Sequence, residues 1–218
     1  MQFYDVTMPI VETMPVYKNK PEKRPVFEIT SNFDSGTVRE TRIHLDVHTG
    51  THIDAHLHMI DKGSTIEAIS LERLIRPCRV IDLTDVSDAI HEVDLAPHSP
   101  QASEFLLFKT KNSFSHEFQM EFIYLAGDAA AKLADIGIAG VGIDALGIER
   151  SQPEHPTHKA LFTKDITVIE GLRLREVPQG QYLLVALPLA LVGLDAAPAR
   201  VLLFPLNENL RHFFDSTA

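Results

Sequence analysis

Four histidines and one aspartate lie within eleven residues of this chain, in the segment His48-Thr49-Gly50-Thr51-His52-Ile53-Asp54-Ala55-His56-Leu57-His58. Neutral imidazoles and carboxylates are the side chains that bind borderline divalent metals. Together, His48, His52 and Asp54 would supply three ligands and leave coordination positions open for water, as catalytic metal sites do. A polar turn with exposed histidines is the alternative, and the clustering argues against it. The spacing alone does not decide which of the four histidines bind.

A second group of potential ligands occurs about a hundred residues later, at Glu154-His155-Pro156-Thr157-His158, and Glu170 follows it. Pro153 and Pro156 predict that the first part of this group is a loop. Glu170 ends the apolar run Ile166–Ile169, where a buried carboxylate requires a cation, and a metal is one candidate. The alternative is a surface loop and a glutamate paired with lysine or arginine.

Other catalytic motifs are missing from the sequence. His91-Glu92 and His116-Glu117 begin like the zinc-protease helix motif, but the second histidine does not follow. Neither a phosphate-binding glycine-rich loop nor a Gly-x-Ser-x-Gly elbow is present. Cys78 is the single cysteine, and its position after Pro77 is typical of a core or strand-start residue.

The element that positions the first cluster is predicted to be a strand. Polar and apolar residues alternate from Thr41 to His48, and this strand would run directly into the histidine-rich segment. His44 and Asp46 would share a face with His48, so either could orient its imidazole, or they could form an ordinary cross-strand polar pair. Gly50 then permits a bend or a close approach of the backbone.

The remaining pattern predicts a sheet-dominated α/β domain. A capping box at Ser64–Glu67 predicts a short helix, and Gly127–Ile136 predicts a longer helix that Gly137 ends. Short runs rich in Val, Ile, Leu and Phe predict buried strands. They lie at Arg79–Leu83, Phe105–Thr110, Ala139–Ile143, Ile166–Ile169, Tyr182–Leu187 and Arg200–Phe204.

Composition narrows the class of protein. A chain of 218 residues with 44% hydrophobic residues fits one domain spanning residues 1–218. The net charge of −10 argues against nucleic-acid binding, and no apolar run is long enough for a membrane span. The N-terminal residues do not resemble a signal peptide, and one cysteine suits a reducing cytoplasm. Residues 14–25 are rich in proline and basic residues and are expected to form an extended arm or loop that covers a site or reaches another subunit.

The segment His48–His58 resembles the signature His-x-Gly-Thr-His-x-Asp-x-Pro-x-His of the cyclase family of metal-dependent hydrolases, which includes bacterial kynurenine formamidases and isatin hydrolases. His158 and the run Glu170-Gly171-Leu172 resemble the family's second ligand pair. Further landmarks spread the resemblance over nearly the whole chain: Asp5, Val141–Asp144, Leu187-Pro188 and Ala197–Arg200.

The resemblance implies a sheet-rich, swivelling β/β/α fold and a homodimer or higher oligomer. It makes His48, His52 and Asp54 metal ligands, with Asp54 bridging to a second ion held by His158 and Glu170. Zinc is the default metal, and the mixed ligands also suit manganese or iron. His58 corresponds to the general acid/base, a role that suits the near-neutral pKa of imidazole.

The implied function is hydrolysis of an amide, cyclic amide or ester of a small molecule by metal-bound hydroxide. Arylformamidase-like cleavage of a C–N bond, within tryptophan catabolism, is one form of it. A metal-assisted cyclase or dehydratase is an alternative, and so is a non-catalytic binding member of the fold, although a binder would not need His58. His56 replaces the proline of the signature, and Tyr17 stands in the place of a substrate-binding tryptophan, which argues against N-formylkynurenine as the substrate.

Overall fold

The computed structural model of the chain describes residues 2–34 and 36–206. Its main sheet is mixed and has the strand order β1-β12-β11-β5-β7-β9-β10-β4. A further pairing of β4 with β12 closes seven of these strands into a barrel and leaves β1 outside the ring. The strands are β1 (Tyr4–Asp5), β4 (His52–Asp54), β5 (Ile75–Asp82), β7 (Phe105–Lys109), β9 (Gly140–Ile143), β10 (Thr167–Glu170), β11 (Gly180–Pro188) and β12 (Ala196–Pro205).

The sheet combines a parallel half with an antiparallel half. Strands β5, β7, β9 and β10 run parallel, whereas β4, β11 and β12 join them through antiparallel pairs. All six short apolar runs predicted as strands lie within or across strands of this barrel, so those predictions are confirmed. The sheet-rich α/β single domain predicted from the sequence is confirmed as well.

Strand β7 separates two hydrophobic cores because its side chains alternate between its faces. Phe105 and Leu107 point into the barrel, while Leu106 and Phe108 face the helices outside. Gly140 makes room inside the barrel, since a Cβ at this position would lie 2.2 Å from a ring carbon of Phe105. Both faces of the strand are therefore buried, as its continuous apolar sequence predicts.

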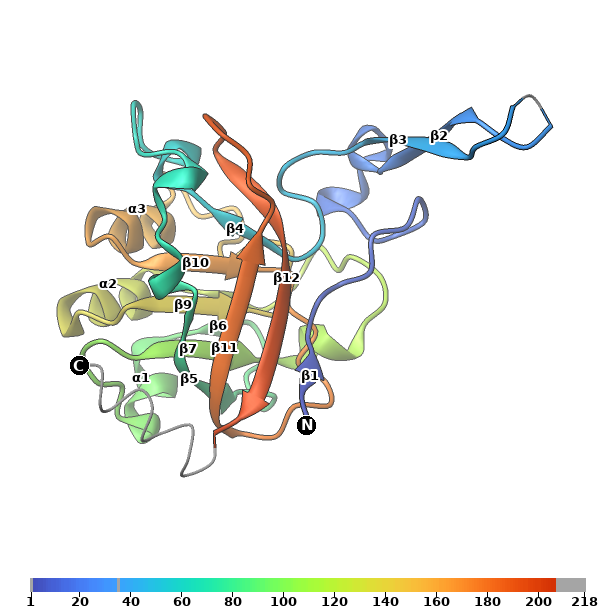
Figure 1. Cartoon of the computed structure of the whole chain (residues 1–218). Coiled ribbons are helices and arrows are strands. Elements are labelled where there is room, and N and C mark those ends of the chain that lie inside the picture. The colour runs from blue at the N-terminus through green and yellow to red at the C-terminus, as the bar shows by residue number, and fades with distance from the viewer. Residues whose placement is uncertain (1, 35, 207–218) are drawn as a thin grey trace.

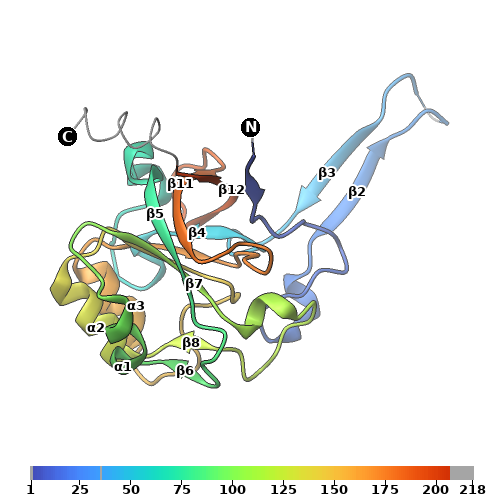
Figure 2. The ribbon, with the colours of Figure 1, turned by 90° about the horizontal axis from the view of Figure 1, so that it is seen from below.

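Three helices cover one side of the barrel: α1 (Glu92–Leu95), α2 (Gly127–Ile136) and α3 (Pro156–Thr163) (Figure 2). A small parallel pair, β6 (Ala89–Ile90) and β8 (Tyr124–Leu125), lies near them. Helix α2 has the predicted bounds and ends at Gly137, whose φ of 78° is left-handed. Within the described ranges, no helix has the length and apolar character that crossing a bilayer requires.

The loop predicted over Glu154–His158 was wrong in part. The stretch around Pro153 and Pro156 is not all loop, because Pro156 begins helix α3; proline fits the first turn of a helix, where its missing N–H is not needed. The short helix predicted after Ser64 is present as 3-10 helix, in one turn at Ile66–Ala68 and a second at Leu71–Arg73. The two turns are separate because Ile69 between them is extended, with φ −78° and ψ 111°.

A β-hairpin of β2 (Val26–Ser31) and β3 (Glu40–His44) projects away from the barrel (Figure 1). The strand predicted over Thr41–His48 therefore runs too far. It ends at His44, and the Thr49 hydroxyl closes a following turn by donating to the Asp46 carbonyl over 2.6 Å. The apolar side of this hairpin is not buried within one chain, since Ile43 is 56% exposed.

Residues 14–25 are anchored at both ends, and Pro25 is buried at the far end, while residues 18–22 between the ends are exposed. The side chains of Met14 and Val16 are buried. Two 3-10 turns follow, at Tyr17–Asn19 and Pro21–Lys23. The segment thus reaches from the core toward the base of the hairpin.

Candidate metal centre

The central element of the candidate site is β4, the short strand that closes the barrel. Side chains two residues apart point to the same side of a strand, so His52 and Asp54 share one face. Ile53 between them points into the barrel core. All three residues are buried, and the strand is held on both sides, by β10 and by β12.

Strand register brings a second carboxylate to this face. Glu170, the last residue of β10, pairs directly with His52. The turn after it requires glycine: Gly171 has a φ of +69°, and a Cβ there would lie 2.1 Å from the Gly50 carbonyl oxygen. Gly50 also has a positive φ, of +62°. The predicted close approach at Gly50 is therefore an approach of two chain segments, which locks Glu170 beside His52.

Helix α3 supplies the fourth member of the cluster, His158. Its Nε2 lies 3.8 Å from Asp54 Oδ2 and 3.5 Å from Glu170 Oε1. On the other side, His52 Nε2 lies 3.3 Å from Asp54 Oδ1 and 3.3 Å from Glu170 Oε2. Two imidazole nitrogens thus face two carboxylates at the junction of β4, β10 and α3.

The polar atoms of this cluster fit a divalent cation. His52 Nε2, both Asp54 oxygens and His158 Nε2 are buried and make no hydrogen bond of good geometry, although imidazole nitrogens lie 2.9–3.8 Å from the carboxylate oxygens. Buried polar atoms are rarely left in this state, because the lost hydration costs free energy. The four atoms face one another, and carboxylate and imidazole are metal-binding groups. One or two cations bound here would satisfy these atoms.

The opposite ring nitrogens fix the tautomers that metal binding needs. His52 Nδ1 donates to the Gly50 carbonyl oxygen over 3.0 Å. His158 Nδ1 donates to Glu149 Oε2 over 2.7 Å. A carbonyl or carboxylate can only accept, so each Nδ1 carries a proton, and the Nε2 lone pair is free to bind a metal.

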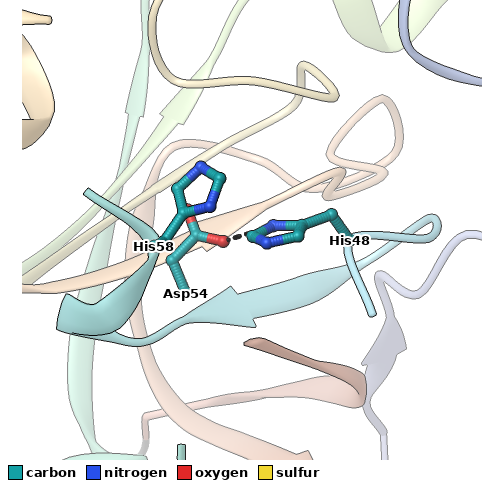
Figure 3. A group of neighbouring side chains, drawn as sticks. All are labelled: His48, Asp54 and His58. Atoms are coloured by element: carbon teal, nitrogen blue, oxygen red, sulfur yellow. Dashed lines mark ion pairs between the residues drawn. The ribbon is translucent and has the colours of Figure 1, made fainter. Parts of the chain in front are cut away.

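His48 and His58, which both line the cavity, lie beside Asp54 (Figure 3). His48 Nδ1 lies 2.9 Å from Asp54 Oδ1, and the ring centroids of His48 and His58 are 4.1 Å apart. Ligand atoms of His48, Asp54 and His58 lie close enough together to hold one ion, as do those of His52, Asp54 and Glu170. Asp54 belongs to both groups, so the arrangement has room for one ion or two.

The electrostatics of the cluster follow from burial and opposite charges. Burial opposes ionisation of Asp54, but the surrounding imidazoles outweigh it and hold the pKa of this carboxyl well below its usual range. They also lower the pKa of Glu170 to about 2. Burial lowers the pKa of His52, yet Asp54 and Glu170 raise it to about 10. A metal ion would take the place of that proton, because ligand imidazoles must be neutral.

His58 differs from the other histidines of the site. Burial is the largest influence on it and lowers its pKa below the usual value, with a smaller contribution from His48. The pKa of His48 is instead raised, because Asp54 and Asp195 outweigh burial. His58 is therefore the imidazole of this group that stays neutral most readily and can accept a proton.

Two carboxylates of the site were missed by the sequence analysis. Glu149, in the loop before α3, holds Nδ1 of His158, and Asp195, in the turn before β12, lies 2.9 Å from His48 Nε2. Asp195 Oδ2 is also 3.7 Å from His58 Nδ1. Both residues lie in irregular segments, and their sequence neighbours carry no motif that signals their role.

The expected orienting residues of His48 have other partners. His44 contacts Glu28 across the hairpin at 3.3 Å, and Asp46 pairs with Lys23 at 2.9 Å. Neither side chain therefore orients His48, and the alternative, a cross-strand polar pair, is confirmed for His44. His56, the departure from the signature, contacts Ser64 and Asp165 on the side away from the cluster.

A cavity of about 370 Å³ opens above the cluster. Its lining includes His48, His58, His158 and Glu170, and Tyr17 from the N-terminal segment forms part of the wall. Burial raises the pKa of the Tyr17 hydroxyl. Tyr17 and four of the six other predicted residues, His48, His58, His158 and Glu170, therefore line the cavity. The remaining two, His52 and Asp54, are buried beneath it.

The protein is a closed mixed barrel with a buried His/Asp/Glu cluster at the strand that closes it. These features define a class of barrel proteins with a candidate metal site. The chain belongs to the cyclase family, because the family model described as "Putative cyclase" matches residues 4–150. The family prediction is thereby confirmed.

Similar proteins cover almost the whole chain. A kynurenine formamidase of Salinibacter ruber is 32% identical over 93% of this chain and 97% of its own length. A solved structure described as a potential metal-dependent hydrolase with cyclase activity is 57% identical, with a TM-score of 0.88 over 94% of this chain and 98% of that chain. Isatin hydrolase A from Labrenzia aggregata, at 22% identity and a TM-score of 0.82 over 94% of each chain, shares the fold.

Proposed function

We propose that the protein is a metal-dependent hydrolase that cleaves an amide, cyclic amide or ester of a small molecule. The observation that carries this proposal is the set of buried, unpartnered ligand atoms of His52, Asp54 and His158 beneath a cavity. The similarity to a kynurenine formamidase and to a potential metal-dependent hydrolase supports the same reaction class.

In this proposal, His48, His52 and Asp54 hold one divalent cation, and Asp54, His158 and Glu170 hold a second. Asp54 suits the bridging position because its two oxygens face different partners, His48 and His52 on one side and His158 on the other. Zinc is the default ion, and manganese and iron also accept mixed imidazole and carboxylate ligands.

A bound cation would lower the pKa of a water molecule and polarise the carbonyl group of a substrate. In this proposal, His58 takes the proton that water loses on attack and returns it to the leaving nitrogen or oxygen. Between these two proton transfers, the protonated His58 imidazole is stabilised by Asp195, which lies 3.7 Å from His58 Nδ1. The balanced reaction adds one water across the C–N or C–O bond and releases an acid with an amine or alcohol.

An arylformamidase-like substrate fits the wall of the cavity. The Tyr17 ring is held by edge contacts with Phe118 and Phe122, at centroid distances of 5.4 and 6.3 Å. A ring fixed in this way offers a flat surface for an aromatic substrate. We therefore expect Tyr17 to contact the substrate body while the acyl group lies over Asp54 and His58.

The experiment begins with metal analysis of the purified protein by mass spectrometry. Turnover of formanilides, lactams, lactones and aryl esters is then measured before and after chelation and after restoring zinc or manganese. We expect metal-dependent release of acid. Metal-loaded protein that turns over none of these compounds would contradict the proposal and favour a binding protein, and release of a cyclised or dehydrated product would favour a cyclase.

The setting of the reaction is also a proposal. A buried free thiol at Cys78 suits a reducing cytoplasm. We further propose a homodimer or higher oligomer, in which the exposed β2–β3 hairpin contacts a second copy.

A further inference from the structure

The cavity above the candidate metal centre has a positively charged rim. Lys18, Lys20 and Lys23 all line it, and all come from the N-terminal segment 14–25. This segment carries four basic residues and one acidic residue, in a chain whose net charge is −10. The basic rim is therefore a local feature that runs against the charge of the whole protein.

Two of these lysines lack an acidic partner. Lys23 lies 2.9 Å from Asp46 and is neutralised by it. In residues 2–34 and 36–206, no carboxylate oxygen lies within 4.0 Å of the amino group of Lys18 or Lys20. Lys18 Nζ instead lies over the Tyr17 ring, 5.3 Å from its centroid.

The backbone holds these lysines at the rim. Val16 is buried before them, and the Asn19 side chain donates to the Phe118 carbonyl over 3.4 Å. Lys18 and Asn19 both adopt left-handed backbone conformations, with φ of 57° and 51°. Such conformations cost free energy for residues other than glycine, so the surrounding contacts must fix this turn.

The cavity therefore has a graded lining. Its floor holds the candidate metal ligands, its wall is apolar with Tyr17, Met59 and Leu146, and its rim holds Lys18 and Lys20. A volume of about 370 Å³ is in the range of small-molecule sites. A ligand that matches all three zones has an acyl group, an apolar ring and a negative charge, in that order.

We propose that the substrate is an anionic aryl amide or ester, whose negatively charged group is recognised by Lys18 and Lys20. This inference rests on the proposed hydrolase function and names its substrate class. Because both lysines are exposed, each contributes only a modest preference, about two- to fivefold, as expected for exposed ion pairs.

The test compares formanilide with 4-formamidobenzenesulfonate, which share the scissile bond and differ in charge. A sulfonate is used because a carboxylate would also bind the metal directly. We expect kcat/KM to be higher for the sulfonate in the metal-loaded protein, and this preference to shrink as salt screens the charges. Lys18→Met and Lys20→Met should each reduce the preference about two- to fivefold, and the double variant about tenfold.

Lys132→Met is the matched control, since it removes one positive charge from α2, where Lys132 pairs with Glu92 away from the cavity. It should leave the ratio of the two kcat/KM values unchanged. Calorimetric binding of 4-aminobenzenesulfonate, the amine product, gives a readout that does not need turnover. Its dissociation constant should rise in the lysine variants by the same factors as the kinetic preference falls.

The outcomes separate the two proposals. In one outcome, both compounds are turned over, but the double variant has the same ratio of kcat/KM values and the same dissociation constant for 4-aminobenzenesulfonate as the unmodified protein. This result overturns the anionic substrate and keeps the hydrolase. Lysine-dependent binding without turnover of these two compounds or of the lactams, lactones and aryl esters overturns the hydrolase and keeps the anion site. Absence of both turnover and lysine-dependent binding overturns both proposals.

Discussion

At the scale of single residues, the histidines of one short segment have different surroundings and hence different roles. His52 is buried with one nitrogen committed to a backbone carbonyl, whereas His58 is partly exposed at the cavity. His56 lies outside the site and contacts Ser64 and Asp165. The surroundings of each side chain, and not its position in the motif alone, determine what it can do.

His58→Ala should abolish most of the activity and leave the metal in place. General acid/base help is typically worth about 10²- to 10⁴-fold in rate, and the variant should lose this factor in kcat. Metal content is measured by mass spectrometry and turnover on the best substrate of the panel. A variant that lost its metal would show that His58 is a ligand.

Asp54→Ala should lose the metal itself, because this carboxylate faces both groups of potential ligands. Asp54→Asn serves as the second variant, since it keeps the shape of the side chain while removing its charge. Both should show near-zero metal after dialysis, while circular dichroism checks that they fold. Full retention of stoichiometric metal in both would mean that Asp54 is not a ligand.

At the scale of elements, the sequence predicted the strands with a continuous apolar signal. Strand β7 and helix α2 were found because burial of both faces and a C-terminal glycine are local signals. Strand β4 has only three residues, and its pairing with β10 and β12 cannot be read locally. The family signature identified His52 and Asp54, but it did not reveal that Glu149 holds His158 or that chain folding brings Asp195 to His48 and His58.

Gly171→Ala should be strongly destabilising and should disturb the metal centre. A Cβ at Gly171 would collide with the Gly50 carbonyl at 2.1 Å, and the positive φ adds strain of about 1–3 kcal/mol. Gly137→Ala is the matched control, because its φ is +78° and a Cβ there meets nothing within 4 Å. Urea unfolding should give a larger loss at Gly171; equal losses would show that the two segments can separate without cost.

At the scale of the whole molecule, the β2–β3 hairpin has an apolar face that no other part of the described chain covers. Strand pairing places Phe27 opposite Ile43, and the side chain of Ile29 lies on the same face as Phe27. Ile29 and Ile43 are 50% and 56% exposed. An isolated two-stranded hairpin is at best marginally stable, so this apolar face is expected to pack on a second copy.

Ile43→Asp should therefore convert an oligomer into a monomer, as measured by size-exclusion chromatography with light scattering. Val26→Asp is the matched control: Val26 is 52% exposed and pairs with His44, on the opposite face of the hairpin. It should leave the mass unchanged. A wild-type protein that elutes with the mass of one chain would contradict the prediction.

Removal of the metal should lower the stability of the whole fold. An ion present at about 100 times its dissociation constant stabilises the folded state by about 2.7 kcal/mol. For a chain of this size, chelation should then lower Tm by roughly 5–10 °C, measured by calorimetry. An unchanged Tm in a protein shown to contain metal would place the ion outside the barrel junction.

The location of the candidate ligands on the strand that closes the barrel has a consequence for biosynthesis. His52 and Asp54 emerge early from the ribosome, but β12, their neighbour in the closed barrel, follows more than a hundred residues later. Until then the open sheet edge cannot fix their geometry, and closing so long a loop is entropically costly. The ion would therefore bind late, after translation. During synthesis, the nascent chain would not yet bind any particular metal of the cell.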